Sequence, residues 1–324
     1  MVKTTVVIPN YNGIKYLPDC LETLQGNFNS GYEFEIVVID NGSKDGSVEF
    51  VKEHYGNVRL VELEENVGFA AAVNIGIREA KGEYVLLLNN DIKVHSDFCA
   101  ELEKCLDEDE KLFSANSVML SMADNSILDG AGDYYSALGW AYAGYKGKAA
   151  SKVVGGRKRH LFSACGGASV YRKSILTEIG LFDENHFAYL EDIDVGYRAR
   201  IRGYKSVLCA SAVCEHAGSG FSGSRYNDFK IGLSGRNSIY IIYKNMPCLQ
   251  ILINLPFLLV GFGIKLAFFM MKGYGKAYIK ALREGFKLCR SAENKKVKFE
   301  GRYTGNYLII QFELWINMFR RLFV

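Results

Sequence analysis

The sequence predicts an α/β protein with a mostly parallel open sheet and flanking helices, followed by a C-terminal helical region that associates with a membrane. Short β-branched runs alternate with amphipathic stretches in the N-terminal part, which is the pattern of an α/β sheet. The formal net charge of +3 hides two unlike parts. Residues 1–235 carry 24 Lys and Arg against 32 Asp and Glu, whereas residues 236–324 carry 15 against 4. We therefore expect an acidic catalytic domain over 1–235 and a basic, apolar helical region over 236–324.

The first part of the chain is expected to form four strands with helices between them. The strands are predicted at residues 5–8, 35–39, 58–63 and 84–88, and the helices at 16–24, 47–54 and 69–80. Residues 84–88 are apolar on both faces, as in a central parallel strand. Because open α/β sheets bind ligands at the carboxyl ends of their strands, the polar clusters at 10–13, 40–43 and 89–91 mark the expected binding edge.

The middle of the chain is less regular. Residues 114–158 are rich in Gly, Tyr and Ala without a clear period, and no element is predicted there. Order returns at 165–171, and we expect a helix at 173–179, a turn at 180–183, an acid-led helix at 189–201 and a strand at 205–208.

An apolar segment at residues 248–271 dominates the C-terminal region. Residues 248–264 carry no charge, and a helix of 24 residues, at about 1.5 Å per residue, is long enough to cross a bilayer core of about 30 Å. Pro256 and Lys265 are equally compatible with a shallow or re-entrant helix, and a buried helix pair on a soluble domain is a third alternative.

Basic residues at helical spacing follow this segment and favour contact with an anionic surface. They are Lys272, Lys276, Lys280, Arg283, Lys287 and Arg290. The last residues, 307–324, include Trp315, Phe319, Arg320 and Arg321, which is an interfacial composition. We expect the protein at the cytoplasmic face of the cell membrane, held peripherally or by its C-terminal region.

Composition excludes several classes of protein. With 324 residues, 49% of them hydrophobic, the chain is too apolar for a disordered protein, and 4 prolines argue against linkers and collagen-like repeats. The 8 cysteines are spread singly, which argues against a clustered zinc site or a disulfide scaffold and favours reduced thiols in the cytosol. Residues 1–5 lead directly into the first strand pattern, so no cleaved signal peptide is expected.

Acidic residues gather at the start of the helix predicted at 189–201. Glu191, Asp192 and Asp194 follow the aromatic residues Phe187 and Tyr189. Acids favour the first turn of a helix because of its free N–H groups and its dipole, which explains one or two of them. The alternative is that one carboxylate acts as a general base beside an aromatic wall.

Three further candidates lie near the expected binding edge. Asn89, Asn90 and Asp91 end the most apolar strand; such a triplet is either a simple turn or, through Asp91, an oxygen ligand for Mg²⁺ or Mn²⁺. His216 is either a core histidine or a ligand. The segment 66–74 places amides at both ends of a turn and a helix start, where a diphosphate or ribose binds.

Two familiar motifs are absent or misplaced. Residues 218–223 fit G-x-G-x-x-G, but no strand and crossover helix surround them, so a mobile loop over a site is a better interpretation than a dinucleotide site. No P-loop and no nucleophile elbow occur, which argues against a P-loop NTPase and a serine hydrolase.

As a set, these segments resemble the inverting glycosyltransferase family 2, whose catalytic domain has the GT-A fold. The resemblance spans about residues 4–223 and is closest to the rhamnosyltransferase-like branch that extends cell-surface polysaccharides. It rests on the order and spacing of residues 6–12, 37–46, 66–69, 87–91, 166–168, 182–184, 191–194 and His216.

The resemblance implies roles for individual residues. Around the nucleotide base and ribose it places Pro9, Tyr11, Asp40 and Asn41; alongside the nucleotide it places Asn66, Gly68 and, on the helix behind, Asn74. Residues Asn89, Asn90 and Asp91 match the D-x-D motif, with Asn89 in place of the first Asp. Asp91 would then hold Mn²⁺ or Mg²⁺ on the sugar-nucleotide diphosphate, and His216 would complete the metal site.

The same resemblance implies an inverting, metal-dependent glycosyltransferase of the hexosyltransferase class. Asp192 matches the general base and Glu191 the residue that contacts the acceptor or orients the donor sugar. The expected partners are a dTDP-rhamnose or UDP-sugar type donor, a lipid-linked glycan acceptor and a membrane surface, with no nucleic acid.

Two other functions are left open by the residues. The first is a catalytically impaired, membrane-tethered protein that binds a sugar nucleotide, which the loss of an acid at Asn89 favours. The second is a sugar nucleotidyltransferase, which usually carries a Gly-rich, basic loop after its first strand; residues 9–13 do not have that composition.

Overall fold

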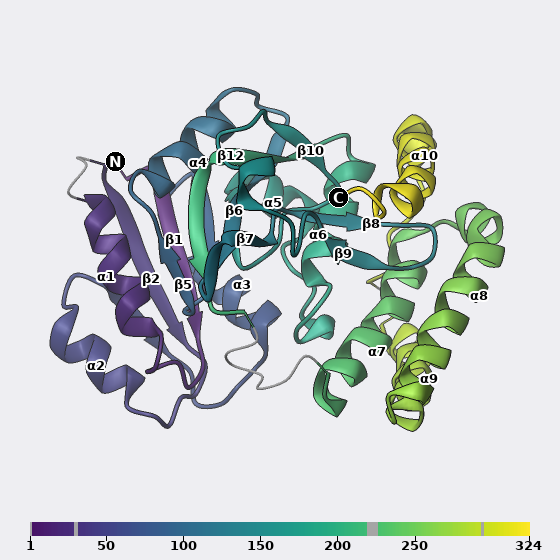
Figure 1. The fold of residues 1–324 in the computed structure, drawn as a ribbon, viewed down its shortest axis with the longest axis horizontal. Helices are drawn as coiled ribbons and strands as arrows, with labels where there is room; N and C mark the ends of the chain where they lie inside the picture. Colours follow the sequence, from purple (N-terminus) through teal and green to yellow (C-terminus); the bar gives the residue numbers. More distant parts are fainter. Residues whose placement is uncertain (1, 29–31, 219–225, 293–294) are drawn as a thin grey trace.

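The architecture is a large mixed sheet with helices on both faces and a bundle of helices at one end (Figure 1). The structure is a computed structural model of residues 1–324, and it describes residues 2–28, 32–218, 226–292 and 295–324. Among these residues, one sheet has ten strands and a second has two. The predicted α/β fold is confirmed.

The centre of the sheet is parallel. Strand β1 lies between β2 and β4, and β3 pairs with the outer side of β2, all in parallel register. These strands are β1 (Thr4–Asn10), β2 (Phe34–Asp40), β3 (Arg59–Glu62) and β4 (Tyr84–Leu88). Their carboxyl ends therefore meet at one edge of the sheet, where the sequence predicts the binding site.

Beyond β4 the sheet becomes mixed. The order continues through β11 (Ala168–Arg172), β6 (Leu112–Ser121), β12 (Lys205–His216) and β10 (Arg159–Leu161), with β5 (Ile92–Val94) and β7 (Asp124–Gly130) on its border. A small hairpin of β8 (Asp133–Tyr135) and β9 (Ala141–Ala143) forms the second sheet. A short 3₁₀ helix, η1 (Ala150–Lys152), follows it.

Two apolar cores separate the sheet from its helices. On one face lie α1 (Leu17–Phe28), α2 (Ser47–His54) and α4 (Phe98–Asp107). On the other lie α3 (Phe69–Glu79), α5 (Lys173–Ile179) and α6 (Glu191–Ile201). The strands fit this arrangement because alternate residues of β1, such as Val6 and Val7, enter opposite cores.

The C-terminal helices pack beside this α/β unit. They are α7 (Asp228–Asn245), α8 (Cys248–Met271), α9 (Gly275–Ser291) and α10 (Thr304–Arg320), with the short 3₁₀ helix η4 (Gly301–Tyr303) before α10. Another 3₁₀ helix, η2 (Glu184–His186), precedes α6 in the α/β unit. A third apolar core joins α6, α7, α8 and α10 to the β8–β9 hairpin. The expected boundary between residues 235 and 236 lies inside α7, whose C-terminal half packs on the α/β unit.

Residues 114–158, where no element was expected, contain most of β6 and all of β7, β8, β9 and η1. Strand β6 lacks a continuous apolar run because it buries Ser114, Asn116 and Ser117. Each has a hydrogen-bond partner: the Ser114 hydroxyl bonds to that of Ser206, and Asn116 Oδ1 accepts from the Cys165 amide. Because these polar groups are satisfied inside the sheet, β6 is a central strand despite its composition.

Strand β12 is also longer than the predicted 205–208. Its pairing with β6 shifts register between Leu208 and Val213, which is a β-bulge or irregularity, and then continues to His216. The extension places His216 at the binding edge.

Candidate active site

Asn10 connects the ends of three parallel strands. Its side-chain amide donates to the carboxylate of Asp40 on β2 at 2.8 Å, and its side-chain oxygen accepts from Asn90, after β4, at 2.7 Å. Asn10 and Asp40 are both buried. No role was predicted for Asn10, although it lies in the polar cluster at the end of the first strand. It holds the predicted nucleotide residues of β2 and β4 together.

The loop after β2 is fixed by its own amides. The second oxygen of Asp40 accepts from the Ser43 amide at 2.9 Å. Asn41 donates to Asn66 at 3.0 Å and accepts from the Val67 amide at 2.9 Å. The structure therefore brings Asp40, Asn41 and Asn66 to one edge, next to the partly exposed Pro9 and Tyr11.

Gly68 caps α3 where no side chain fits. Its φ of 89° is in the left-handed region, and a Cβ there would lie 2.5 Å from the Phe187 ring. The amide of Gly68 donates to Asn66 at 2.9 Å. This close contact joins the start of α3 to the segment that precedes the acidic helix.

Asn74 has protein partners on that same segment. Its side chain donates to the carbonyl of Phe182 and to Glu184, both at 2.9 Å, and accepts from the Phe182 amide at 3.0 Å. Asn74 thus anchors residues 182–184 on α3. Its predicted position behind the nucleotide stays a prediction.

Asp91 and His216 meet at the edge of the sheet. His216 Nε2 lies 3.4 Å from Asp91 Oδ1, and His216 Nδ1 lies 2.7 Å from Asp129 Oδ2. Asp91 is 7% exposed. Burial lowers the pKa of His216, but the hydrogen bonds to Asp129 and Asp91 outweigh it and raise this pKa to about 9. Burial raises the pKa of Asp129, which hydrogen bonds from His216 and Lys146 lower to about 2.

This geometry fits a divalent metal. A histidine that ligates a metal with one ring nitrogen usually donates with the other to a carboxylate, and Asp129 occupies that position. Asp91 supplies the hard oxygen ligand that Mg²⁺ and Mn²⁺ prefer. Asn90 bonds to Asn10, and the Asn89 amide nitrogen donates to the Gly167 carbonyl at 2.8 Å. Asp129 was missed because it lies in β7, where no element was expected.

The acidic helix α6 begins after an unusual backbone. Phe187, Tyr189 and Leu190 have φ of 62°, 69° and 68°, a conformation that side chains seldom adopt. The Asn237 amide holds this segment by donating to the carbonyls of His186, Ala188 and Tyr189 at 3.0, 2.9 and 2.7 Å. Helix α7 therefore fixes where α6 starts, a role that no local pattern around Asn237 predicts.

The Asp192 carboxylate lies next to the residues that precede β11. Its carboxylate accepts from the Ile193 amide at 2.7 Å and from the Gly166 amide at 3.4 Å. The Ser163 hydroxyl donates to its carbonyl at 2.5 Å. Burial raises the pKa of Asp192, and hydrogen bonds from the Ile193 and Gly166 amides oppose this shift. A carboxyl group with a raised pKa is suited to taking a proton near neutral pH.

A second carboxyl group lies beside Asp192. Side-chain atoms of Asp133, on β8, and of Cys165 lie within 4.8 Å of an Asp192 carboxylate oxygen. Burial and the Asp192 charge raise the pKa of Asp133 well above its usual value. The spacing of the three groups also fits metal ligation. Asp133 was missed because β8 was not expected.

Glu191 has a polar atom that no described residue satisfies. The side chain is 6% exposed, and its buried Oε2 has no hydrogen-bond partner among the described residues. Burial and the nearby Asp192 charge raise the pKa of Glu191 well above its usual value. A buried, unbonded oxygen costs free energy, which a bound hydroxyl group recovers. Glu191 therefore offers a polar ligand an unbonded oxygen beside Asp192.

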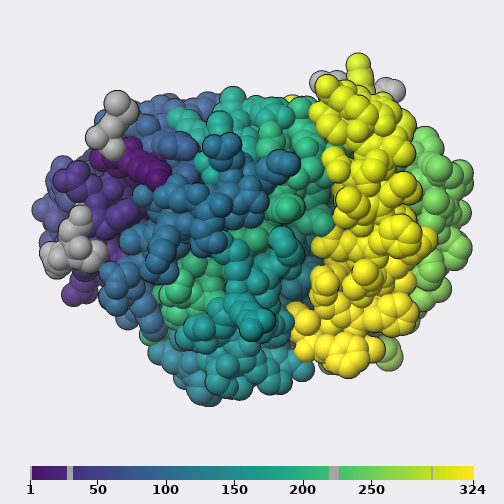
Figure 2. All heavy atoms as spheres, turned by 90° about the horizontal axis from the view of Figure 1, so that it is seen from above, coloured from purple at the N-terminus to yellow at the C-terminus, as the bar shows by residue number. Residues whose placement is uncertain are grey.

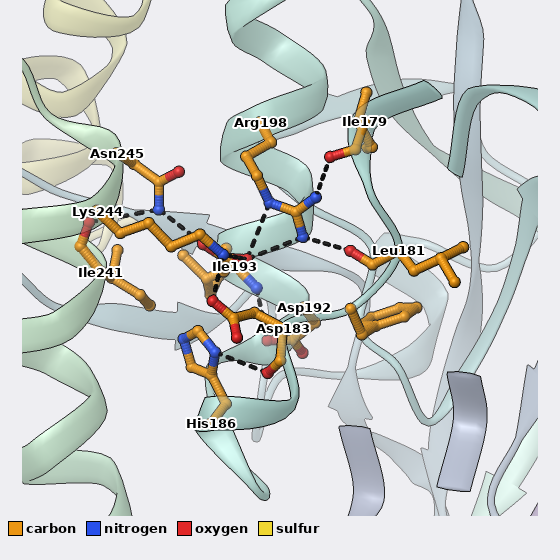
Figure 3. A network of polar contacts seen from close by, with 12 residues as sticks. Ile179, Leu181, Asp183, His186, Asp192, Ile193, Arg198, Ile241, Lys244 and Asn245 are labelled. Carbon is orange, nitrogen blue, oxygen red and sulfur yellow. Dashed lines mark hydrogen bonds and ion pairs between the residues drawn. The ribbon is translucent and has the colours of Figure 1, made fainter. Parts of the chain in front are cut away.

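Asp194, in contrast, belongs to a buried ion network, whose members Asp183, Arg198, Lys244 and Asn245 are labelled in Figure 3. Arg198 Nη2 lies 2.9 Å and Lys244 Nζ 2.8 Å from its carboxylate, and Lys244 Nζ also lies 2.6 Å from Asp183. Asn245 donates to the other oxygen of Asp194 at 2.8 Å. Asp183, His186 and Asp194 have metal-ligand spacing, but the Lys244 ammonium and the Arg198 guanidinium together neutralise the two acids. The group therefore supports α6.

The G-x-G-x-x-G segment at 218–223 cannot be placed in this site. Gly218 is described, with φ of 74°, and residues 219–225 lie outside the described residues.

Comparison with known proteins is consistent with the geometry. A family model described as glycosyl transferase family 2 matches residues 5–180. Among curated relatives, the poly(ribitol-phosphate) beta-N-acetylglucosaminyltransferase TarS of Staphylococcus aureus (strain Mu50) is 30% identical over 111 residues, which is 33% of this chain and 19% of TarS. The chain therefore matches about a fifth of the length of that relative.

Solved structures share the fold. S. aureus TarS 1–349 in complex with UDP-GlcNAc superposes with a TM-score of 0.58 at 18% identity, over 89% of this chain and 81% of that one. GalNAc-T7 with UDP, GalNAc and Mn²⁺ gives 0.59 at 17% identity, over 75% and 48%. At these identities the likeness concerns the fold alone.

Proposed function

The chain belongs to glycosyl transferase family 2, and on that premise we propose that it is an inverting glycosyltransferase of cell-surface polysaccharide synthesis. It transfers a sugar from a nucleoside-diphosphate sugar to a hydroxyl group of a lipid-linked glycan. The observation that carries the proposal is the pair Glu191–Asp192, where a carboxyl group of raised pKa adjoins a buried oxygen without a described partner. The relative named for transfer to poly(ribitol phosphate) supports a hydroxyl-bearing cell-surface polymer as the acceptor.

Asp192 is the proposed general base. It accepts the proton of the acceptor hydroxyl, whose oxygen attacks the anomeric carbon as the bond to the nucleoside diphosphate breaks. One displacement inverts that centre and requires no protein nucleophile. Glu191 binds the acceptor or orients the donor sugar. Backbone amides of Ile193 and Gly166 hold the Asp192 carboxylate in place before proton transfer.

Asp91 and His216 are the proposed holders of Mn²⁺ or Mg²⁺. Such an ion, when bound, neutralises the charge that develops on the leaving diphosphate. Asp129 keeps the His216 ring oriented through Nδ1, so that Nε2 faces Asp91. A GT-A structure solved with UDP and Mn²⁺ supports this assignment.

The donor occupies the edge formed by the strand ends. Pro9, Tyr11, Asp40 and Asn41 surround the base and ribose, and Asn66, Gly68, Asn74, Asn89 and Asn90 complete the nucleotide side of the site. One Asp40 carboxylate oxygen accepts from Asn10 and the other from the Ser43 amide, and each can accept a further hydrogen bond from a base or ribose. The donor is of the UDP-sugar or dTDP-rhamnose type, and a relative solved with UDP-GlcNAc supports the first.

The acceptor requires a membrane location, which we propose to be the cytoplasmic face of the cell membrane. Among the described residues, one helix, Cys248–Met271, is long and apolar enough to cross a bilayer. A single helix of this kind is weak support for a membrane location. The C-terminal helices are the proposed contact.

A donor panel tests the function. The full chain, with Mn²⁺ and membranes that carry lipid-linked glycans, is incubated separately with UDP-, dTDP- and GDP-sugars while nucleoside diphosphate release is measured. We expect one donor to give release that depends on the membranes and is lost with Asp192→Asn. If calorimetry detects donor binding but no donor gives release, the chain is the impaired binding protein that Asn89 favours.

A further inference from the structure

Helix α8 packs its polar residues against the protein. Its buried residues are Gln250, Asn254, Leu258 and Gly261, which recur every three or four positions and so form one stripe. The Tyr197 hydroxyl donates to Gln250 at 2.7 Å, and Asn254 and Gln311 of α10 bond to each other in both directions at 2.8 Å. A helix with this orientation is amphipathic in the reverse of the usual sense: its polar side is the inner one.

The same stripe touches the α/β unit over most of the helix. Near its middle, the Gly261 carbonyl accepts from Trp140 Nε1 at 3.1 Å, and a Cβ at Gly261 would lie 2.2 Å from the Leu138 carbonyl oxygen. Further on, Lys265 Nζ lies 5.9 Å from the Trp140 ring centre. Partners from α6 and from the β8–β9 hairpin thus flank α8 from residue 250 to residue 265.

The outer sides of α8 and α10 are apolar and exposed. Leu252 and Leu259 of α8 are 65% and 66% exposed, and Phe312 of α10 is 58% exposed. The remaining large exposed apolar side chains of these two helices include Leu249, Val260, Ile264, Met270, Met271, Leu308, Ile309, Ile316 and Phe319. Because the Asn254–Gln311 pair joins the two helices, we define these residues together as the apolar face. Such a large exposed apolar surface marks a contact site.

Helix α9 adds a basic surface to the same end of the molecule (Figures 1 and 2). Its inner residues, such as Tyr278 and Gly285, pack on α7. On its exposed side lie Lys276, Lys280, Arg283, Lys287 and Arg290, interspersed with Ile279 and Phe286. Cations beside exposed apolar groups complement a surface of acyl chains and anionic headgroups.

We propose that α8 and α10 lie in the plane of an anionic bilayer surface, with the apolar face in the headgroup region and α9 contacting anionic lipids. Helix α8 does not span the membrane, since a spanning α8 would carry its α6 and β8–β9 partners into the hydrocarbon core. The inference rests on the membrane location proposed above and specifies its geometry. It predicts that the α/β unit lies against the bilayer along its α8–α10 end.

Vesicle sedimentation tests the surface with the full chain. We expect binding to phosphatidylglycerol–phosphatidylcholine vesicles and weak binding to phosphatidylcholine alone. The combined variant L252E/L259E/F312E loses binding, and K276E/K280E/R283E lowers it roughly tenfold or more, because each cation near the surface contributes about 1 kcal/mol. The control K104E/K111E/R157E makes the same charge change on exposed residues away from this end and keeps binding.

Depth measurements test the orientation. Single tryptophans at Leu252, Leu259 and Met270, in a chain where Trp140 and Trp315 are phenylalanine, report depth through quenching by brominated lipids. All three are quenched at one shallow depth if α8 lies in the plane; a deeply quenched Leu259 position with shallow ends indicates a spanning helix and overturns the proposal. Circular dichroism verifies that each variant is folded.

Two other outcomes also overturn it. The first is absence of vesicle binding together with a stable dimer that L252E/L259E/F312E dissociates, since the face then binds a second copy. The second is equal binding to both vesicle types. Failure of the proposed function is separable, because Asp192→Asn abolishes nucleoside diphosphate release and leaves vesicle binding unchanged.

Discussion

Lys244, near the end of α7, places its Nζ atom 2.8 Å from a carboxylate oxygen of Asp194 in α6, and both side chains are buried. The same ammonium lies 2.6 Å from Asp183. One cation from the C-terminal part therefore pairs with two acids that lie on either side of Glu191 and Asp192 in the sequence, and Arg198 supplies the second positive charge. Helix α7, which crosses the expected boundary between residues 235 and 236, therefore holds the start of α6 in place.

Replacing Lys244 with methionine should destabilise the protein by about 3–5 kcal/mol, because the change leaves buried carboxylates without their cation. Urea unfolding at pH 7 measures this effect. Lys52→Met is the matched control: Lys52 pairs with Glu62 at 2.8 Å on the exposed surface, and its loss should cost less than about 1 kcal/mol. Equal effects of the two substitutions would show that the buried network does not stabilise α6.

The same network predicts acid sensitivity. Burial raises the pKa of Asp194, but Arg198 and Lys244 outweigh it and hold this pKa far below its usual value; Lys244 likewise lowers the pKa of Asp183 against burial. A carboxyl group with a depressed folded-state pKa stabilises the fold above its unfolded value of about 4, and this stability is lost as the pH falls below it. The contribution of this network to the free energy of unfolding, measured by urea unfolding as the difference between the wild type and Lys244→Met, should therefore be steady from pH 7 to 5 and shrink below pH 4.

Local pattern predicted much of the α/β unit. The strand at 84–88 and the helices at 47–54 and 173–179 have the predicted bounds, because each is an uninterrupted apolar or amphipathic segment with clear turns beside it. Strand β6 was not predictable in the same way. Its buried Ser114, Asn116 and Ser117 depend on partners far away in the sequence, such as Cys165 and Ser206. The local composition of β6 does not indicate that these partners exist.

The residues of the candidate site likewise fall into those that a local motif predicts and those that depend on distant parts of the chain. Asp91, Glu191 and Asp192 were predictable because each lies in a motif and at the end of an element. Asp129 and Asp133 were not, since each depends on how β7 and β8 lie against residues distant in the chain. Asn237 and Lys244 were missed for a related reason: they lie on α7, and their partners on the α6 side become visible only when the helices are packed.

Asp133→Asn should stabilise the protein at high pH. A carboxyl group with a raised folded-state pKa is unfavourable once it ionises, so its penalty is absent at pH 4 and present at pH 8. An amide at this position can donate to Asp192. We expect a gain of about 0.5–2 kcal/mol at pH 8, as is common when a strained active site is relieved, and no gain at pH 4. Thermal unfolding at the two pH values measures it, and an equal gain at both would contradict the ionisation argument.

Asp129→Asn should weaken Mn²⁺ binding roughly 10–100-fold, because groups that orient a histidine ligand typically have effects of this size. Electron paramagnetic resonance titration of Mn²⁺ into the protein with UDP gives the affinity without any turnover. Asp124→Asn, in the exposed part of the same strand, is the control and should leave the affinity unchanged. An unaltered Mn²⁺ affinity in Asp129→Asn would argue that His216 is not a metal ligand.

Asp192→Asn should abolish sugar transfer while donor binding persists. The amide keeps the size of the side chain but cannot accept the proton of the acceptor hydroxyl, and loss of a general base typically costs 10²–10⁴-fold in rate. The amide side chain can still accept from the Ile193 backbone amide, so the local backbone should keep its place and the dissociation constant of the donor should stay within about threefold of the wild-type value by calorimetry. Glu191→Gln is the companion variant: it retains Asp192, so transfer should fall less and the KM for the acceptor should rise, because Glu191 contributes binding through its unbonded oxygen. Wild-type turnover in Asp192→Asn would assign the base elsewhere, and Asp133, which lies beside Asp192, would be the residue to replace next.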